Sequence, residues 1–73
     1  MPRTADVLSR FGQRLRQKRQ ALGLSQEEFA ARCGLDRTYI SGIERGLRNV
    51  SLRNIHTLAV ALGTTVSDLT ADL

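Results

Sequence analysis

The sequence predicts an all-α fold, and three features of its composition and pattern support that class. Hydrophobic residues make up 41% of the 73 residues but aromatic residues only 4%, so small aliphatic side chains must form the core. This composition suits short packed helices better than a β-sandwich. Apolar residues recur at intervals of three and four, as in amphipathic helices. Glycines follow several of these stretches, where a helix end favours a left-handed residue.

We expect one domain over residues 1–73, containing five short helices with marked ends. The N-terminal signals are Ser25 with Glu28 in an S-x-x-E capping box, Asp36, Ser51, and Thr65 with Asp68. The C-terminal signals are Gly23, Gly34, Gly46 and Gly63. These signals predict helices near 5–22, 26–33, 37–45, 52–62 and 66–72.

Each expected helix has an apolar face that is directed to the core. In chain order, the faces comprise Leu8, Phe11, Leu15 and Leu22; Phe29, Ala30 and Cys33; Ile40, Ile43 and Leu47; Leu52, Ile55, Leu58, Ala59 and Leu62; and Val66 and Leu69. Cys33 is the only cysteine, so neither an internal disulfide nor a cysteine-clustered zinc site can form. We expect it to be a small buried hydrophobic residue rather than a reactive thiol.

The charge balance favours an anionic partner, above all nucleic acid. Eleven Lys and Arg residues against seven Asp and Glu residues give a formal net charge of +4. Ten of the eleven cations are arginines, whose planar guanidinium group suits phosphates and guanine edges. The chain has no apolar run long enough for a bilayer and no secretory signal, which predicts a cytoplasmic protein without membrane contact. His56 is the only histidine, and we expect no metal site, no cofactor and no enzymatic activity.

The segment "GLD" between the second and third expected helices predicts a helix-turn-helix, because so short a connection forces a sharp turn. With about 100° of rotation per residue, the third helix turns a short-chained, cationic face away from its apolar face. That outer face contains Thr38, Ser41, Gly42 and Arg45, with Arg37 and Tyr39 beside it near the helix start. A flat face of this kind helps a helix to enter the major groove of DNA.

Gly42 lies at the centre of this face and costs about 1 kcal/mol relative to alanine in a helix. We expect its missing side chain to permit close approach to DNA. The alternative is an exposed glycine that is merely tolerated. Close approach by another helix conflicts with its position opposite the apolar face.

The stretch "LSQEEFAARCGLDRTYISGIERGLRN" resembles the Cro and phage-repressor helix-turn-helix family, also called XRE-like, and the resemblance covers nearly the whole chain. Within that family, "LDRTYISGIERGLRN" is similar to the controller proteins of restriction-modification systems, which are small dimeric regulators. The resemblance implies a compact five-helix, lambda-repressor-like fold. It also implies a sequence-specific transcriptional regulator that binds a palindrome-like operator in double-stranded DNA as a homodimer.

Matching residues carry the implied DNA contacts. Gln26, first in the second helix, matches a position that contacts a phosphate at the helix N-terminus. Arg37, Thr38 and Ser41 match residues that address base edges, with Arg37 suited to a bidentate contact with guanine. Thr38 has a thymine methyl group or a phosphate as alternative targets.

Further contacts are implied around both ends of the third helix. Tyr39 matches a position against the DNA backbone, although a tyrosine at the edge of the core is an equal alternative. Arg45, Arg48 and Asn49 are placed for phosphates or the neighbouring minor groove. A solvated charge is the alternative for Arg48 and for Arg53, and Arg53 is left out of the site.

The resemblance has two further implications, one for DNA specificity and one for the fold. Many phage repressors have a long side chain at the position of Gly42, so part of the specificity here should come from DNA shape. Arg19 and Glu44 match positions that often form a partly buried ion pair between the first and third helices, which makes Arg19 structural.

The resemblance places dimerisation on the fourth and fifth helices. The candidate contacts are Val60, which the helical wheel leaves exposed, and the C-terminal Leu69 and Leu73, with a position wholly in the core as the alternative for Leu69. Two copies would address half-sites about 34 Å apart. The length leaves no segment for an effector domain, so we expect no small-molecule ligand. An activating role would add RNA polymerase as a partner. The alternatives are a prophage-type repressor, an antitoxin or a protein-binding helical module, although the polar face of the third helix argues against the last.

Overall fold

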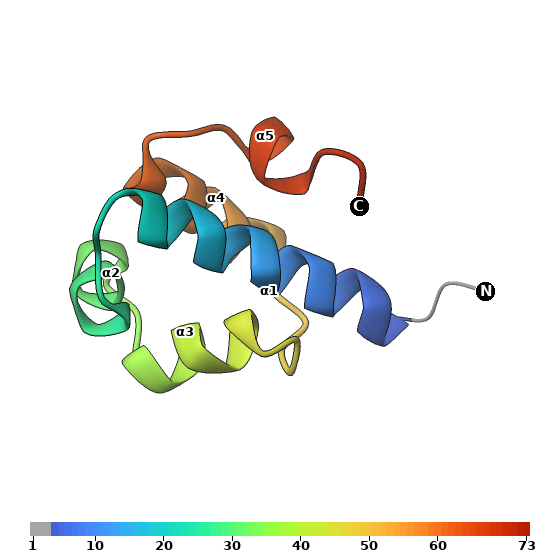
Figure 1. Cartoon of the computed structure of the whole chain (residues 1–73), viewed down its shortest axis with the longest axis horizontal. Helices are drawn as coiled ribbons and strands as arrows, with labels where there is room; N and C mark the ends of the chain where they lie inside the picture. Colours follow the sequence, from blue (N-terminus) through green and yellow to red (C-terminus); the bar gives the residue numbers. More distant parts are fainter. Residues whose placement is uncertain (1–3) are drawn as a thin grey trace.

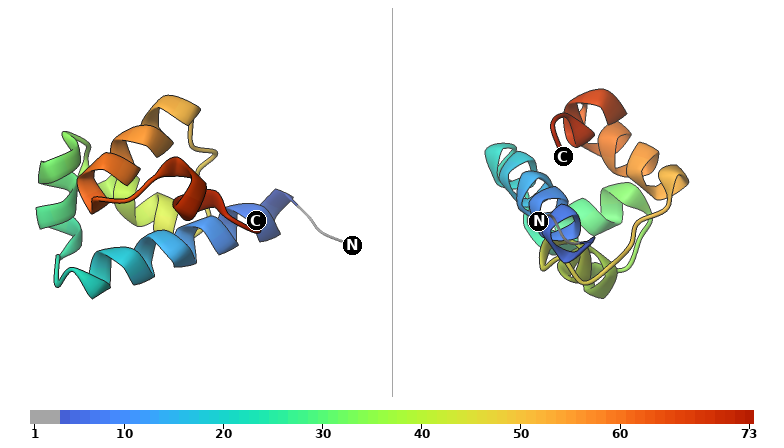
Figure 2. Two further views of the ribbon diagram at one scale, coloured as in Figure 1. Left: turned by 90° about the horizontal axis from the view of Figure 1, so that it is seen from above. Right: turned by 90° about the vertical axis from the view of Figure 1, so that its right-hand side faces the viewer.

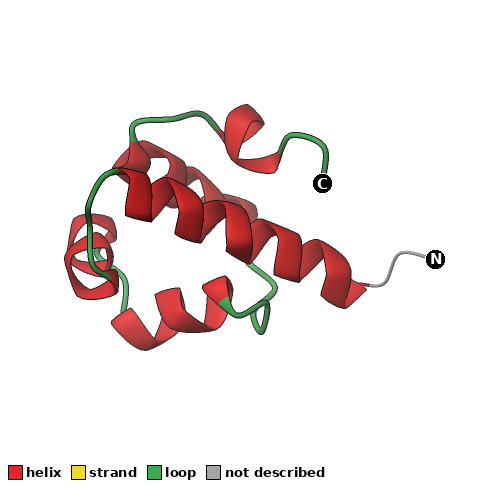
Figure 3. Cartoon of the chain, viewed as in Figure 1, coloured by secondary structure: helices red, strands yellow, loops and turns green. Residues whose placement is uncertain are grey.

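The computed structural model describes residues 4–73, which form five α-helices and no strand (Figure 1; Figure 3). The helices are α1 (Thr4–Ala21), α2 (Gln26–Cys33), α3 (Arg37–Glu44), α4 (Leu52–Leu62) and α5 (Val66–Thr70). The all-α prediction is confirmed. Among the residues described here, no helix combines the length and apolar character needed to cross a membrane.

The long helix α1 lies along one edge of the molecule (Figure 2) and contacts both α3 and α5, which lie on either side of it in Figure 1. The core between the helices receives at least one fully buried side chain from each of them. These side chains are Leu15, Phe29, Ile40, Ile43, Leu58 and Leu69. Burying each one stabilises the fold by about 1.5–3 kcal/mol before entropy is counted. Cys33 packs half-buried against this core, where burial raises the pKa of its thiol and disfavours the reactive thiolate.

Local capping explains where most helices begin. The Ser25 hydroxyl accepts a hydrogen bond from Glu28 N at 3.0 Å, and Ser25 N donates to Glu28 Oε1 at 2.8 Å, so the predicted capping box is confirmed. Ser51 and Thr65 cap α4 and α5 through their side chains. Asp36 occupies the N-cap position of α3 but makes no capping bond, contrary to our expectation. Its carboxylate instead accepts a hydrogen bond from the Thr38 hydroxyl at 3.1 Å.

Three helices end earlier than the sequence predicts, at Ala21, Glu44 and Thr70. All four predicted C-terminal glycines have positive φ, and Gly46 reverses the chain after α3 with φ 75°. The prediction that Leu22, Leu47 and Leu52 lie in the core is therefore wrong. Leu22 is 49% exposed and Leu47 62%, because each follows the last residue of its helix. Leu52 is 72% exposed because it stands in the first turn of α4.

Gly12, which the sequence reading did not single out, allows α1 to lie against the end of α3. A Cβ atom at this position would meet the carbonyl oxygens of Ile43 and Glu44, the latter at 2.7 Å. Real Cβ atoms essentially never approach so closely, and the neighbours are backbone atoms that cannot turn away. The contact between α1 and α3 therefore requires glycine.

Two arginines of α1 bind the carbonyl groups at the end of the α5 segment. Arg10 donates to Leu73 O, and Arg14 donates to Leu69 O and Ala71 O. These contacts tie α5 to α1 on the side opposite α3 (Figure 2). Arg10 and Arg14 thus serve the fold within the monomer.

Candidate nucleic-acid interface

The turn between α2 and α3 fixes the angle at which α3 is presented. Gly34 caps α2 in the left-handed region with φ 68°, and Leu35 N donates to Ala30 O at 3.0 Å. Leu35 then packs against the core, which anchors the turn. As a result α3 buries Ile40 and Ile43 on its inner side and exposes its N-terminal residues.

A buried ion pair joins α1 to the C-terminal end of α3, as predicted. Arg19 Nε lies 2.6 Å from Glu44 Oε2, and Arg19 Nη2 lies 2.9 Å from Glu44 Oε1. Arg19 Nη1 donates to Leu24 O at 2.7 Å, which occupies the remaining side of the guanidinium group. Arg19 is only 7% exposed, and the hydrogen bond that it donates to Glu44 raises its pKa, so the guanidinium group stays charged. Arg19 is therefore structural.

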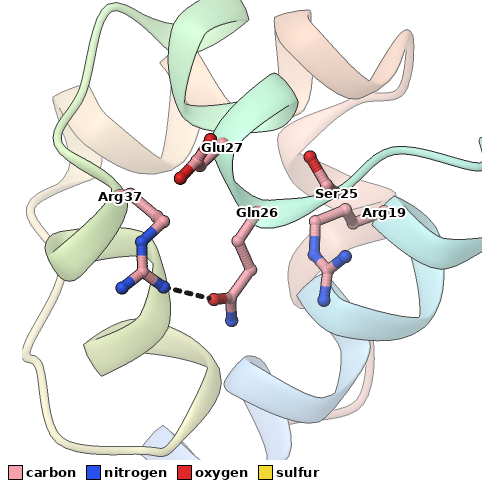
Figure 4. A pocket seen from close by; sticks show the side chains of 5 residues that line it. All are labelled: Arg19, Ser25, Gln26, Glu27 and Arg37. Atoms are coloured by element: carbon pink, nitrogen blue, oxygen red, sulfur yellow. Dashed lines mark hydrogen bonds between the residues drawn. The ribbon is translucent and has the colours of Figure 1, made fainter.

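Gln26 connects this ion pair to Arg37 at the start of α3. Its Nε2 donates to Glu44 Oε1 at 3.2 Å, and its Oε1 accepts from Arg37 Nη1 at 3.2 Å. Figure 4 shows the amide extending toward the Arg37 guanidinium, with Arg19 on its other side. The two bonds fix which way the amide points, because the carboxylate needs a donor and the guanidinium needs an acceptor.

The sequence reading placed Gln26 only against a phosphate and missed this connection. Gln26 and Arg37 border an open groove of about 490 Å³, lined also by Arg19, Ser25 and Glu27 (Figure 4). The contact spans eleven positions along the chain, so it depends on the placement of α2 beside α3. No local signal in the sequence identifies it.

Gly42 is buried, which corrects the expectation of a bare, exposed position. The side chain of Arg48 lies over it. A Cβ at residue 42 would be 3.0 Å from Arg48 Nε and 3.1 Å from Arg48 Cγ. A long basic side chain from the following loop therefore covers the outer face of α3 at Gly42, while Thr38 and Arg45 stay exposed.

Tyr39 lies beside this arrangement at the edge of the core. It is half-buried, and its hydroxyl accepts a hydrogen bond from Asn54 Nδ2 at 3.0 Å. The Arg48 Cζ atom lies 6.0 Å from the centre of the tyrosine ring, at the outer limit of a cation–π contact. Asn54, on α4, was not part of the predicted site.

The other predicted contact residues lie around α3. Arg37, Thr38, Arg45, Arg48 and Asn49 are exposed, while Ser41 is half-buried. Of the residues assigned to dimerisation, Val60 is 64% exposed on α4. Leu69 is completely buried in the core, so its assignment to a dimer surface is wrong. Leu73 packs half-buried against the core.

Comparison with known proteins gives consistent matches. The family model described as "Helix-turn-helix" matches residues 15–69. Control protein C.MunI of Mycoplasma sp. is 48% identical over 69 residues, which cover 93% of each chain. The restriction-modification controller protein C.AhdI from Aeromonas hydrophila superposes with a TM-score of 0.83 and 57% identity, covering 89% of this chain and 97% of that one. The controller protein C.Esp1396I, solved as a tetramer in complex with its natural 35 base-pair operator, has a chain that matches with a TM-score of 0.80 and 33% identity, covering 86% of this chain and 83% of that one.

The chain belongs to the helix-turn-helix family. Within that family it is similar to restriction-modification controller proteins, as the resemblance in the sequence implied. The family is one of DNA-binding regulators, in agreement with the prediction of a non-enzymatic protein.

Proposed function

We propose that this protein is a sequence-specific transcriptional regulator of the controller type, which binds a palindrome-like DNA operator as a homodimer in the cytoplasm. The observation that carries the proposal is the placement of Arg37. Its guanidinium stands exposed at the start of the recognition helix α3 and is oriented by Gln26. An arginine held in this way meets DNA with less loss of side-chain freedom.

Arg37 is the principal base-reading residue in this proposal. Its bond to Gln26 uses one N–H of Nη1, and a guanidinium group has five N–H donors. The remaining donors match the O6 and N7 acceptors of guanine in the major groove. Thr38 and Ser41 follow along the same helix and supply hydroxyl groups for neighbouring bases or phosphates.

Phosphate contacts come from the start of α2 and from the end of α3. The first N–H groups of a helix lack partners inside the helix and favour an anion. Gln26 has a second hydrogen on Nε2 that is free to point at a phosphate beside the groove. Arg45 and Asn49 are exposed near the other end of α3 and suit the next phosphates along the strand.

Dimerisation would place two copies of α3 in successive major grooves, about 34 Å apart. Val60 offers an exposed apolar side chain on α4 for this contact, and Leu73, half-buried against the core, is the second candidate. The proposed contact surface excludes Leu69, which the core already buries. Occupancy of the operator then depends on protein concentration, because only the dimer addresses both half-sites.

Selection of bound sequences from random duplex DNA tests this function. We expect a palindrome-like consensus, and affinity for it that falls steeply with salt because several phosphates are neutralised. Failure to enrich any sequence, with weak binding of similar strength to every duplex, would contradict a controller-type regulator. The same assay with Arg53→Ala is the control, because Arg53 is exposed on α4 but lies outside the proposed site.

A further inference from the structure

The side chain of one arginine lies directly over the buried Gly42. Gly42 is the third-last residue of α3, and the nearest atoms around its absent Cβ are Nε, Cγ and Cδ of Arg48. Arg48 itself is exposed. The arginine stem therefore lies flat on the helix while its other side faces solvent.

The backbone after α3 brings Arg48 to this position. Gly46 adopts φ 75°, and Leu47 N donates to Gly42 O at 2.9 Å, which folds the chain back over the last turn. Gly46 also presses on α1, since a Cβ there would lie 2.6 Å from the Ser9 hydroxyl oxygen. The start of the loop is thus held by its conformation and by a neighbouring helix.

Tyr39 supplies a second support for the guanidinium group. Its ring lies 6.0 Å from Arg48 Cζ, and its hydroxyl is held by Asn54 of α4. Arg48 is therefore bounded by the bare backbone at Gly42 along its stem and by an aromatic ring near its charged end.

We propose that Gly42 is a positioning residue for Arg48: its missing side chain provides the seat on which Arg48 lies, so that the guanidinium is presented on the outer side of α3, beside Tyr39. The inference rests on the proposed function and assigns a role within it. Arg48 takes the place of the long side chain that residue 42 lacks. DNA approaching this face meets the seated arginine rather than bare helix.

Substitution of Gly42 by alanine separates this role from simple tolerance. A methyl group 3.0 Å from Arg48 Nε and 3.1 Å from Cγ leaves too little space, and the flexible arginine is the part that gives way. The folded protein should keep a thermal midpoint at or above that of the wild type, because alanine favours a helix over glycine. Affinity for DNA should fall on the order of tenfold, as for loss of one charge-assisted contact.

The decisive experiment combines two measurements on wild type, Gly42→Ala, Arg48→Ala and the double variant. NMR of the free proteins follows the Nε–Hε and δ-methylene signals of Arg48, which the Tyr39 ring should shift away from those of exposed Arg53. Binding to the duplex selected by the wild type gives the four affinities. We expect Gly42→Ala to move the Arg48 signals toward those of Arg53, and Arg48→Ala to lower affinity as much as Gly42→Ala, with no further loss in the double variant.

Three results would overturn the proposal. Unchanged Arg48 signals in Gly42→Ala would show that the added methyl group does not displace the Arg48 side chain. Unchanged affinity would show that the glycine is only tolerated. Losses that add in the double variant would show that Gly42 acts on DNA independently of Arg48. If the wild type selects no duplex, the proposed function fails, while the NMR measurement still decides whether Gly42 seats Arg48.

Discussion

A glycine makes a close contact on each side of α3. The two contacts differ in the atoms that lie against the glycine, which are backbone atoms on one side and a side chain on the other. On the inner side, Gly12 of α1 lies against the backbone carbonyls of Ile43 and Glu44. On the outer side, Gly42 lies under the side chain of Arg48. Backbone cannot move without shifting a helix, whereas an arginine can turn away. An added methyl group should therefore disturb the fold at Gly12, whereas at Gly42 it should displace only the Arg48 side chain.

Glu44→Ala should be the most damaging change on the inner side. It leaves Arg19 buried with Leu24 O as its remaining partner in the described part of the chain. Loss of one member of a buried pair costs about 3–5 kcal/mol, a large share of the stability of so small a domain. Chemical denaturation followed by circular dichroism measures the loss.

The double variant Arg19→Met with Glu44→Leu is the control for that experiment. It removes both charges, so most of the lost stability should return. A melt of Glu44→Ala that coincides with the wild type would contradict the structural role of the pair.

Gly12→Ala should be next, with a loss of about 3 kcal/mol, at the upper end of the usual cost of overpacking. Its Cβ has no flexible neighbour to displace, because the obstructing atoms are carbonyl oxygens of α3. Thermal unfolding of Gly12→Ala and Gly42→Ala side by side compares the same chemical change at two helix positions. We expect the first to melt well below the wild type and the second to gain up to about 1 kcal/mol. Equal shifts for both would abolish the distinction between the two sides.

Arg37→Ala should leave the fold intact and change recognition, because Arg37 is exposed on the outer side. We expect a loss of about 1–3 kcal/mol in binding to the selected duplex, with relaxed preference at one or two base positions. Repeating the duplex selection with the variant measures both effects. A uniform loss over all sequences would move Arg37 from base reading to phosphate contact.

Gln26→Ala tests the link between the two sides of α3, because Gln26 forms hydrogen bonds with the buried Glu44 and with the exposed Arg37. A residue that only contacts phosphate would weaken all duplexes alike. We now expect a partial loss of base preference as well, since Arg37 loses the acceptor that orients it. Unaltered preference in the repeated selection would show that the bond to Arg37 has no part in recognition.

The smallest effect is expected at the start of α2, away from both glycines. Hydrogen bonds from the backbone N–H and the hydroxyl of Ser25 hold the pKa of Glu28 below its ordinary value of 4.5. A carboxyl group whose pKa is lower in the folded state stabilises the fold above its unfolded pKa and loses that contribution as the pH falls through the folded pKa. The stability of Glu28→Gln should therefore depend less on pH below about 4.5 than that of the wild type.

Melting curves recorded between pH 7 and pH 2 measure this difference. Glu27→Gln removes an adjacent acidic group without removing the capping bond, so it should keep the acid dependence of the wild type. Identical pH profiles for all three proteins would exclude a contribution from the capping box.

The sequence predicts the helices well where the signals are local. The bounds of α2 and α4 agree with the prediction. Ser25 and Ser51 cap the N-termini of these two helices, and Gly34 and Gly63 directly follow their last residues. The helical periodicity misled where it was continued past a helix end. Continued periodicity predicts Leu47 on the inner face of α3, but Gly46 reverses the chain before that residue.

The contacts that define the candidate site depend on tertiary packing and could not be predicted in the same way. The Arg19–Glu44 pair came from the family resemblance rather than from spacing. The seat of Arg48 on Gly42 requires a loop that folds back on α3. The need for Gly12 appears only when α1 and α3 are placed side by side. In each case the two residues in contact lie in different helices or loops, so no local sequence pattern predicts the contact.

The most direct test of the difference between the two sides of α3 is an NMR titration of the uniformly ¹⁵N-labelled protein with the selected duplex. We expect the largest changes at the backbone amides of Arg37 and Thr38 and at the side chains of Gln26 and Arg48. The amides of Gly12 and Leu15, on the inner side, should change least. Largest changes along α5, with α3 unaffected, would contradict the assignment of the outer side of α3 as the DNA-reading surface.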